Sequence, residues 1–421
     1  MPETTTIKTS VVERFLRYVT VDTQSAEGSS TYPSTLKQLV LLDQLVQELK
    51  AIGLADAARD EHGYVMATIP PTTRKSNVPV IGFLAHVDTS PEMSGANVKP
   101  IVHRNWQGQD LVLPDDPIAI IRSADHPALA EQIGNDIITA SGATLLGADN
   151  KAGVAEIVAA AEYMMRHPEI AHGAIRVGFT PDEEVGGGTT HFDVKKFGAV
   201  CGYTMDGSGR GELETETFSA DAMIVTFQGV NTHPGFAKGK MVNSIKVAAD
   251  FIDRLPKDRM SPETTAGREG FVHPYVVHAS VDQTAVRFLI RDFATARLQE
   301  KEAFLEALAR ETATAWPGVT VTFKVEESYR NMKEVLDQHL QIADYAREAI
   351  RRAGLEVHES AIRGGTDGSR LSFMGLPTPN IFAGEHSFHS RFEWVSAQDM
   401  EKAVEVIVHL AQVWEERTPA G

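Results

Sequence analysis

The chain has 421 residues, 42% of them hydrophobic, which is more than one hydrophobic core usually holds and predicts about two domains. Its formal net charge of −17 disfavours nucleic acid and anionic membrane surfaces as partners. No apolar stretch approaches the roughly 18 residues that span a bilayer, and the first residues, MPETTTIKTS, lack the basic and apolar regions of a secretory signal.

The cysteine usage bears on the compartment. Cys201 is the single cysteine, so it cannot form an intrachain disulfide. Such usage is typical of a reducing compartment, in which a lone cysteine is an ordinary buried side chain. Together with the acidic charge, this predicts a cytoplasmic protein.

The first half of the chain alternates between helical and strand patterns. Apolar residues recur at helical spacing over 12–19, 35–52 and 154–165. Two continuous apolar runs, 78–87 and 174–179, are typical of buried strands. Strands that alternate with helices predict a largely parallel sheet covered on both faces.

The pattern changes after Glu216. A strand, a helix, two strands, a helix and a strand are expected in turn over 220–230, 241–255, 271–293, 296–315 and 319–323. This βαββαβ order is that of a ferredoxin-like unit. Helix–strand alternation resumes near residue 335. We therefore expect an α/β fold in which a small α+β domain, 216–328, is inserted into a larger domain formed by 1–215 and 329–421.

The chain ends on a predicted helix that begins at Ser396. Asp399 follows three residues later. This spacing predicts a capping box, in which each of the two side chains accepts a hydrogen bond from the backbone N–H of the other residue.

Polar side chains stand where predicted strands end and where a helix begins. His86 and Asp88 close the 78–87 strand, and side chains two apart on a strand share a face. Alone, this pair is better explained as a turn histidine and an N-capping aspartate. Asp149 stands at the mouth of the 154–165 helix, where a carboxylate commonly caps backbone N–H groups but can also bridge two cations.

Three consecutive acids, Asp182, Glu183 and Glu184, follow the 174–179 strand. Carboxylates beside a buried strand are costly without a counter-charge, although solvated acidic turns are common. Three glycines come next and let the backbone turn tightly. The run is a stronger candidate for a functional site because its strand is expected to lie beside the strand that ends at His86.

Two more candidates come later in the chain. Asp206 stands at a further strand end, and His389 lies near the C-terminus with His386 as a competitor. The edge of an open α/β sheet at the strand ends is where sites form. Two imidazoles and three carboxylates suit zinc, and one bridging carboxylate would hold two metals about 3.5–4 Å apart. The candidate ligands are His86, Asp149, Glu184, Asp206 and His389.

The sequence resembles the M20 family of di-zinc exopeptidases, and within it the peptidase T group, over nearly its whole length. The motifs that carry the resemblance include AHVDTSPE (85–92), LLGADNKAG (145–153), GFTPDEEVGGG (178–188), THPGFAKGKMVN (232–243) and IRGGTDGS (362–369). The resemblance implies a zinc-exopeptidase catalytic domain with an inserted lid or dimerisation domain. It also implies removal of the N-terminal residue from short peptides, with tripeptides as the expected substrates.

The resemblance further implies how two Zn²⁺ ions per chain are held. It places His86 and Asp206 on one ion and Glu184 and His389 on the other, with Asp149 bridging both. It also implies that the peptide bond after Asp149 is cis.

Catalytic roles follow from the same resemblance. Asp88 is expected to orient His86, and Glu183 is expected to be the general base that takes a proton from a metal-bridging water. His233 is expected to reach the active site of the partner subunit in a homodimer and to stabilise the oxyanion. Read without the resemblance, His233 is a turn histidine before a proline.

Three further residues match family positions near the substrate: Asn243, Arg291 and Arg363. Arg363 is a candidate binder of a substrate carboxylate or carbonyl. Without the resemblance, an arginine is usually a surface residue, so these roles depend on the family alone.

The sequence departs from the peptidase T pattern at the last ligand. The run from Gly384 to Ser390 reads Gly-Glu-His-Ser-Phe-His-Ser, and the alignment places the ligand at His389, with Glu393 four residues on. The family usually has a Gly-Gly-Tyr-Asn-Tyr-His-Gly-like run here, so Glu385 stands where a second glycine is expected. Glu385 and His386 are new relative to that pattern and are expected to lie close to the metals. They bear on substrate choice more than on the chemistry.

Other interpretations stay open. Another activity in the same family, a carboxypeptidase or an N-acyl amino acid deacylase, needs nearly the same residues. A non-catalytic metal-binding or peptide-binding protein could keep the fold, although such proteins usually lose a ligand or the base. A plain α/β protein with scattered acids would place the candidate residues far apart.

Overall fold

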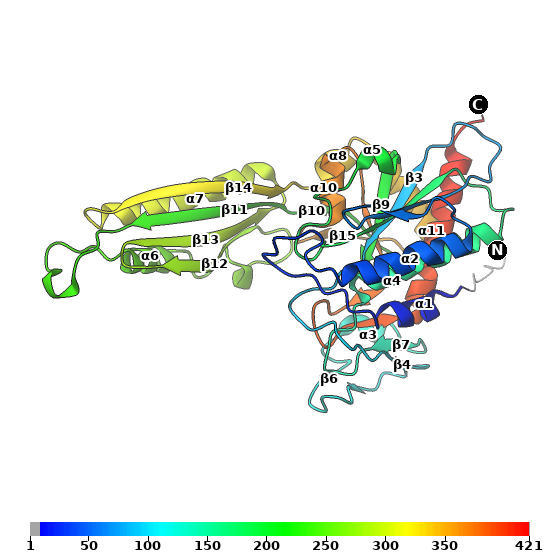
Figure 1. The fold of residues 1–421 in the computed structure, drawn as a ribbon, viewed down its shortest axis with the longest axis horizontal. Helices are drawn as coiled ribbons and strands as arrows, with labels where there is room; N and C mark the ends of the chain where they lie inside the picture. Colours follow the sequence, from blue (N-terminus) through cyan, green and yellow to red (C-terminus); the bar gives the residue numbers. More distant parts are fainter. Residues whose placement is uncertain (1–8, 421) are drawn as a thin grey trace. The chain divides into compact units, whose positions relative to one another are not determined.

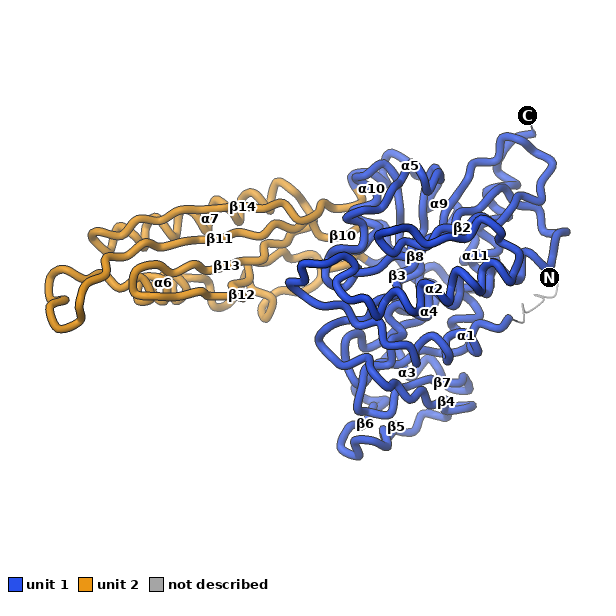
Figure 2. The backbone as a smooth tube through the Cα atoms, viewed as in Figure 1, with its two compact units in different colours: residues 1–215, 334–360, 366–421 blue, residues 216–333, 361–365 orange. Residues whose placement is uncertain are grey.

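The computed structural model describes residues 9–420, which form two compact units (Figures 1 and 2). Unit 1 consists of Met1–Thr215, Glu334–Ser360 and Thr366–Gly421, and unit 2 consists of Glu216–Lys333 and Ala361–Gly365. The mixed α/β architecture agrees with the expected fold class. Within the described range, no helix is long and apolar enough to cross a membrane.

Unit 1 is built on an eight-stranded sheet with the order β1-β2-β8-β3-β9-β16-β10-β15. The central pairs β8–β3, β3–β9 and β9–β16 are parallel, whereas β1–β2, β2–β8 and β16–β10 are antiparallel. The sheet is therefore mixed, with its parallel part in the middle. The strands are β1 Ala58–Arg59, β2 Val65–Ile69, β3 Ile81–His86, β8 Ile175–Thr180, β9 Cys201–Gly207, β10 Glu212–Thr217, β15 His358–Ile362 and β16 Asn380–Phe382.

Helices cover both faces of this sheet, and the alternation of side chains along β3 shows why. Phe83 and Ala85 belong to the large core that includes α1, α2, α4, α9 and α11. Leu84, between them, packs on the other face with Phe197 of α5 and Leu371 of α10. The helices of unit 1 and its border are α1 Val11–Tyr18, α2 Gln38–Ile52, α3 Pro127–Ala130, α4 Ala148–Arg166, α5 Val194–Phe197, α8 Lys333–Leu336, α9 Leu340–Arg352, α10 Asp367–Phe373 and α11 Ala397–Arg417.

Short strands that the sequence did not reveal form two further sheets in unit 1. One has the order β17-β18-β7-β4, and β5 pairs with β6 in the other. With two or three residues each, these strands are too short to show an alternation of apolar and polar residues in the sequence. They matter because β17 carries Glu385 and His386, at which the sequence departs from the family pattern. Their bounds are β4 Ile101–His103, β5 Leu111–Val112, β6 Ile120–Ile121, β7 Ile137–Thr139, β17 Glu385–His386 and β18 Trp394–Ser396.

Unit 2 is a four-stranded antiparallel sheet with the order β12-β13-β11-β14. Alternate residues of β11, Met223, Val225 and Phe227, share a core with residues of the helices α6 and α7. The chain order is the expected βαββαβ. The elements are β11 Ser219–Gln228, η1 Pro234–Phe236, α6 Ser244–Asp253, η2 Pro262–Thr264, β12 Phe271–Ala279, β13 Gln283–Asp292, α7 Thr295–Thr314 and β14 Thr320–Tyr329.

The predicted capping box at α11 is wrong. Ser396 is the N-cap residue and has an extended backbone, but its side chain makes no capping hydrogen bond. Asp399 is fully buried and accepts hydrogen bonds from Arg210 Nε and Gln132 Nε2. A guanidinium is a stronger partner for a buried carboxylate than a backbone amide, and the sequence near Ser396 does not reveal Arg210.

Candidate metal centre

The parallel strands β3 and β9 bring the first two candidates together. Leu84 lies opposite Thr204, so two residues further along both strands His86 and Asp206 are neighbours on one face. His86 Nε2 lies 3.5 Å from Asp206 Oδ1 and 3.0 Å from Asp149 Oδ1. Asp149 arrives from the first turn of α4, so three separate segments meet at one imidazole nitrogen.

The other two candidates, Glu184 and His389, lie on the side of Asp149 Oδ2. β8 ends at Thr180, opposite His86, and the turn that follows carries Glu184. His389 Nε2 lies 2.8 Å from Glu184 Oε2 and 3.3 Å from Asp149 Oδ2. All five candidate ligands therefore lie in one cluster, with Asp149 between the two histidines.

Asp88 links His86 to the acidic turn. Its backbone oxygen lies 3.0 Å from His86 Nδ1, and its Oδ1 lies 3.3 Å from the same nitrogen. Its carboxylate also accepts the backbone N–H groups of Glu183 and Glu184, at 2.9 and 3.1 Å. Asp88 thus positions the imidazole and the turn at once. The peptide bond between Asp149 and Asn150 is cis, as the resemblance implied.

The structure separates the three acids of the turn. Asp182 has a φ of 59° and points away from the cluster. It accepts hydrogen bonds from Ser34 N at 2.6 Å, from the Ser34 hydroxyl, and from Gln38 Nε2 at 2.6 Å. Asp182 therefore anchors the turn, which leaves Glu183 and Glu184 for the site.

The two histidines near the C-terminus also have different surroundings. The ring of His386 stacks on Trp394, with centroids 3.9 Å apart and planes 14° apart. Burial, together with the nearby His126, lowers the pKa of His386 to about 4. His389 instead faces Glu184 and Asp149, so the geometry favours His389 as the ligand.

Burial and neighbouring charges shift the pKa values of several groups in this cluster. Burial disfavours charge on His86, but Asp206, Asp149 and Asp88 outweigh it and hold its pKa well above the usual value. Burial, reinforced by Asp149, raises the pKa of Glu184 to about 8, against the effect of both histidines. Desolvation likewise raises the pKa of Glu183 well above its usual range. Protons on such groups are the ones that bound cations displace.

The donor set fits divalent cations. Two groups of side chains, His86–Asp149–Glu184 and Asp149–Asp206–Glu385, have ligand atoms within 4.8 Å of one another and share Asp149. Glu184 Oε1 is buried and has no hydrogen-bond partner in the described range. Nitrogen and carboxylate oxygen are the ligands of Zn²⁺ and related ions. Glu385 is in this cluster, and the sequence signalled it only as a departure from the family pattern.

Glu393 supports the centre without facing it. Its Oε2 accepts the backbone N–H groups of Leu146 and Gly147 at 2.7 and 2.8 Å, and its Oε1 accepts that of Asp149 at 2.9 Å. One buried carboxylate thus holds the backbone that presents Asp149. The resemblance kept Glu393 in place but did not reveal this role.

We expect Glu393→Ala to destabilise the protein by about 3 kcal/mol, because three buried amides lose their acceptor at about 1 kcal/mol or more each. Urea unfolding followed by tryptophan fluorescence measures this, with Glu61→Ala as control because the Glu61 side chain is 87% exposed. An unchanged midpoint for Glu393→Ala would show that the amides find other acceptors.

Two candidate residues of unit 2, His233 and Asn243, are N-cap residues of helices in that unit. His233 is exposed and caps η1, with its Nδ1 accepting the N–H of Gly235 at 3.1 Å. Asn243 caps α6 through a hydrogen bond from Ile245 N at 2.9 Å. Local capping therefore explains part of the pattern at both positions.

The two arginines also have partners inside unit 2. Arg363 Nη1 donates to the backbone oxygens of Gly267 and Glu269, at 2.7 and 2.9 Å. Arg291 Nη1 donates to the backbone oxygen of Arg363 at 3.3 Å. Arg363 thus holds the loop that precedes β12.

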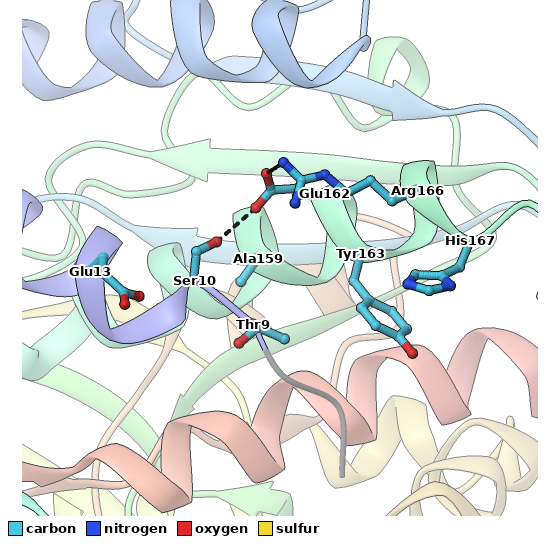
Figure 3. Close-up of a pocket in the computed structure, with 8 residues that line it drawn as sticks. All are labelled: Thr9, Ser10, Glu13, Ala159, Glu162, Tyr163, Arg166 and His167. Atoms are coloured by element: carbon cyan, nitrogen blue, oxygen red, sulfur yellow. Dashed lines mark hydrogen bonds and ion pairs between the residues drawn. The ribbon is translucent and has the colours of Figure 1, made fainter. Parts of the chain in front are cut away.

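A cavity of about 380 Å³ is lined by residues of α1, of α4 and of the segments next to them (Figure 3). It contains none of the candidate residues. Glu162 in its wall accepts a hydrogen bond from Ser10 Oγ at 2.7 Å and pairs with Arg166. The charges of Glu162 and Arg166 are therefore paired with each other, and the metal centre stays the candidate site.

Comparisons with known proteins show the family to which the chain belongs. A model described as peptidase family M20/M25/M40 matches residues 136–413. Peptidase T of Clostridium botulinum (strain Loch Maree) is 49% identical over 407 residues, which are 97% of this chain and 99% of that protein.

Two solved structures share the fold. Aminopeptidase PepT from Bacillus cereus gives a TM-score of 0.73 at 21% identity and covers 96% of this chain and 98% of its own. A tripeptidase from Staphylococcus aureus gives a TM-score of 0.73 at 21% identity, with coverage of 97% and 98%.

Proposed function

Because the chain belongs to peptidase family M20/M25/M40, we propose that it is a two-zinc aminopeptidase that removes the N-terminal residue from short peptides, with tripeptides preferred. The relative at 49% identity is named Peptidase T, and the two structural neighbours are described as an aminopeptidase and a tripeptidase. The observation that carries the proposal is the cluster in which His86, Asp206, Glu184 and His389 meet around Asp149.

The chain's own residues have distinct tasks in the reaction. Two cations held by the five ligands would activate water and polarise the scissile carbonyl. Asp88 holds His86 and the acidic turn in position relative to each other. Glu183, whose pKa is raised well above its usual range by burial, takes the proton of the attacking water and delivers it to the leaving amine.

His233 is suited to donate a hydrogen bond to the oxyanion. Because Gly235 N–H donates to His233 Nδ1, the neutral ring carries its proton on Nε2. In the proposed homodimer, this exposed N–H serves the site of the partner subunit. The homodimer and the cytoplasmic location stay predictions.

We expect His233→Ala to lower kcat by about 10²–10³-fold, because one donor to the developing oxyanion is lost. Bound metal should stay unchanged, since His233 lies outside the ligand cluster. His278→Ala, which removes an exposed histidine of the same unit, is the control. Near-native turnover of His233→Ala would exclude the oxyanion role.

Three substrates separate this activity from its rivals: a free tripeptide, its N-acetylated form and its C-terminal amide. An aminopeptidase should release the first residue from the free peptide and from the amide, and should leave the acetylated form intact. Mass spectrometry identifies the product. Release of the last residue would indicate a carboxypeptidase, and release of acetate would indicate a deacylase. No turnover of any of them by metal-loaded protein would favour a non-catalytic binder.

A further inference from the structure

We propose that Glu385 is an additional metal ligand, which binds the cation on the Asp206 side together with His86, Asp206 and the bridging Asp149. This inference rests on the proposed two-metal function. It adds a residue that the family pattern does not supply, because the expected residue at this position is glycine.

The backbone after β16 places Glu385 beside the end of β9. Ala383 N donates to the oxygen of Gly207 at 2.8 Å, so the chain after β16 runs beside the residue that follows Asp206. Gly384 then turns the chain with a φ of 79°, a conformation that glycine adopts without strain. β17 begins at the next residue.

The strand geometry sets the direction of the side chain. Neighbouring residues on a strand point to opposite faces. Because His386 stacks on Trp394, Glu385 faces the other way, towards the cluster. An oxygen of Glu385 lies within 4.8 Å of oxygens of both Asp149 and Asp206.

No hydrogen-bond partner among the described residues explains the burial of Glu385. The residue is 0% exposed, and neither carboxylate oxygen has a hydrogen-bond partner within residues 9–420. A buried carboxylate without a partner is strongly destabilising. Ligand oxygens on one Zn²⁺ lie about 3–4 Å apart, given metal–oxygen distances of 2.0–2.2 Å.

The extra ligand makes the two cation positions unequal. The cation beside Asp206 would have four protein side chains, whereas the cation beside Glu184 and His389 would have three, counting Asp149 in both. An open coordination position marks a catalytic metal, so the substrate carbonyl should approach on the Glu184 side. Three carboxylates and one imidazole also favour a harder cation, such as Mn²⁺, at the Asp206 position.

The test measures metal binding to the full chain after treatment with a chelator. Zn²⁺ dissociation constants come from competition with a chromophoric chelator, and the visible spectrum of the Co²⁺-loaded protein reports the number of ligands. Glu385→Gln removes the charge and keeps the shape. Glu156→Gln is the matched control, because Glu156 of α4 is also 0% exposed, has no hydrogen-bond partner for either oxygen among the described residues, and is absent from the cluster.

We expect Glu385→Gln to weaken one Zn²⁺ site at least about tenfold, since even groups that only support a ligand commonly contribute 10–100-fold. The Co²⁺ spectrum should change in Glu385→Gln and stay as in the wild type in Glu156→Gln. If Glu385→Gln does not fold, Glu385→Gly takes its place in the same assays.

Dissociation constants within twofold of the wild type at both sites, with an unchanged Co²⁺ spectrum, would overturn the inference and identify Glu385 as a neutral buried acid. That result would leave the proposed function intact if the wild type binds two Zn²⁺ per chain. Wild-type protein that binds no Zn²⁺ would instead overturn the proposed function and this inference with it.

Discussion

Glu183→Gln is expected to lower kcat by about 10²–10⁴-fold, the contribution typical of a general base. Its backbone N–H is held by Asp88 Oδ1 at 2.9 Å, so the side chain is presented beside the cluster without belonging to either group of ligand atoms. An amide cannot accept the proton of the attacking water. Steady-state kinetics on a tripeptide, with metal analysis of the same sample, measure the effect.

The metal analysis makes this result specific. Glu183→Gln should keep the wild-type metal content, because the five ligands remain. Glu61→Gln, at an exposed position of unit 1, should keep both metal and turnover. Near-native kcat in Glu183→Gln would remove Glu183 from the mechanism, and a loss of metal would make it a ligand instead of a base.

His389→Ala is expected to lose one of two bound cations and to lower turnover at least about 100-fold. His389 Nε2 lies 2.8 Å from Glu184 Oε2, so its removal leaves that cation with two protein ligands, fewer than the three of a typical catalytic zinc site. Metal content per chain after dialysis, measured by atomic emission, gives the result directly.

His386 provides a matched control only three residues away. His386→Phe keeps a ring against Trp394, and His386 Nε2 has no hydrogen-bond partner in the part of the chain that the structure describes. We expect His386→Phe to keep both cations. If His386→Phe lost a cation and His389→Ala did not, the assignment of the two histidines would have to be exchanged.

Much of the centre could be predicted because it lies at strand ends. Parallel strands place their carboxyl ends at one edge of a sheet, so His86, Asp206 and the acids after β8 were expected to meet. The structure brings them together through the register of β3 with β8 and β9. The cis peptide bond after Asp149 came from the resemblance, because no local pattern reveals it.

Other features depend on partners that are distant in the sequence. The division of tasks among Asp182, Glu183 and Glu184 is set by Ser34 and Gln38, which bind the first of the three acids. The capping box at Ser396 failed because the buried Asp399 accepts a hydrogen bond from Arg210, which lies in the turn between β9 and β10. Local patterns cannot identify such partners, whereas burial and pairing in the fold do.

The orientation of Glu385 could not be predicted from the local sequence either. The sequence marked Glu385 as a departure from the family pattern shortly before the last ligand, but the strand β17 has only two residues. In so short a strand, no alternation of apolar and polar residues indicates which of two neighbouring side chains faces the site. The stack of His386 on Trp394 decides the matter, and it exists only in the folded chain.

The central claim is that two cations in this cluster support peptide hydrolysis. A titration tests it most directly: Zn²⁺ is returned stepwise to chelator-treated protein, and release of the N-terminal residue from a free tripeptide is followed against bound metal. Turnover should be absent at the start and should reach its maximum as binding approaches two ions per chain. Full turnover in the metal-free protein, or a tightly bound stoichiometry below one, would contradict the account.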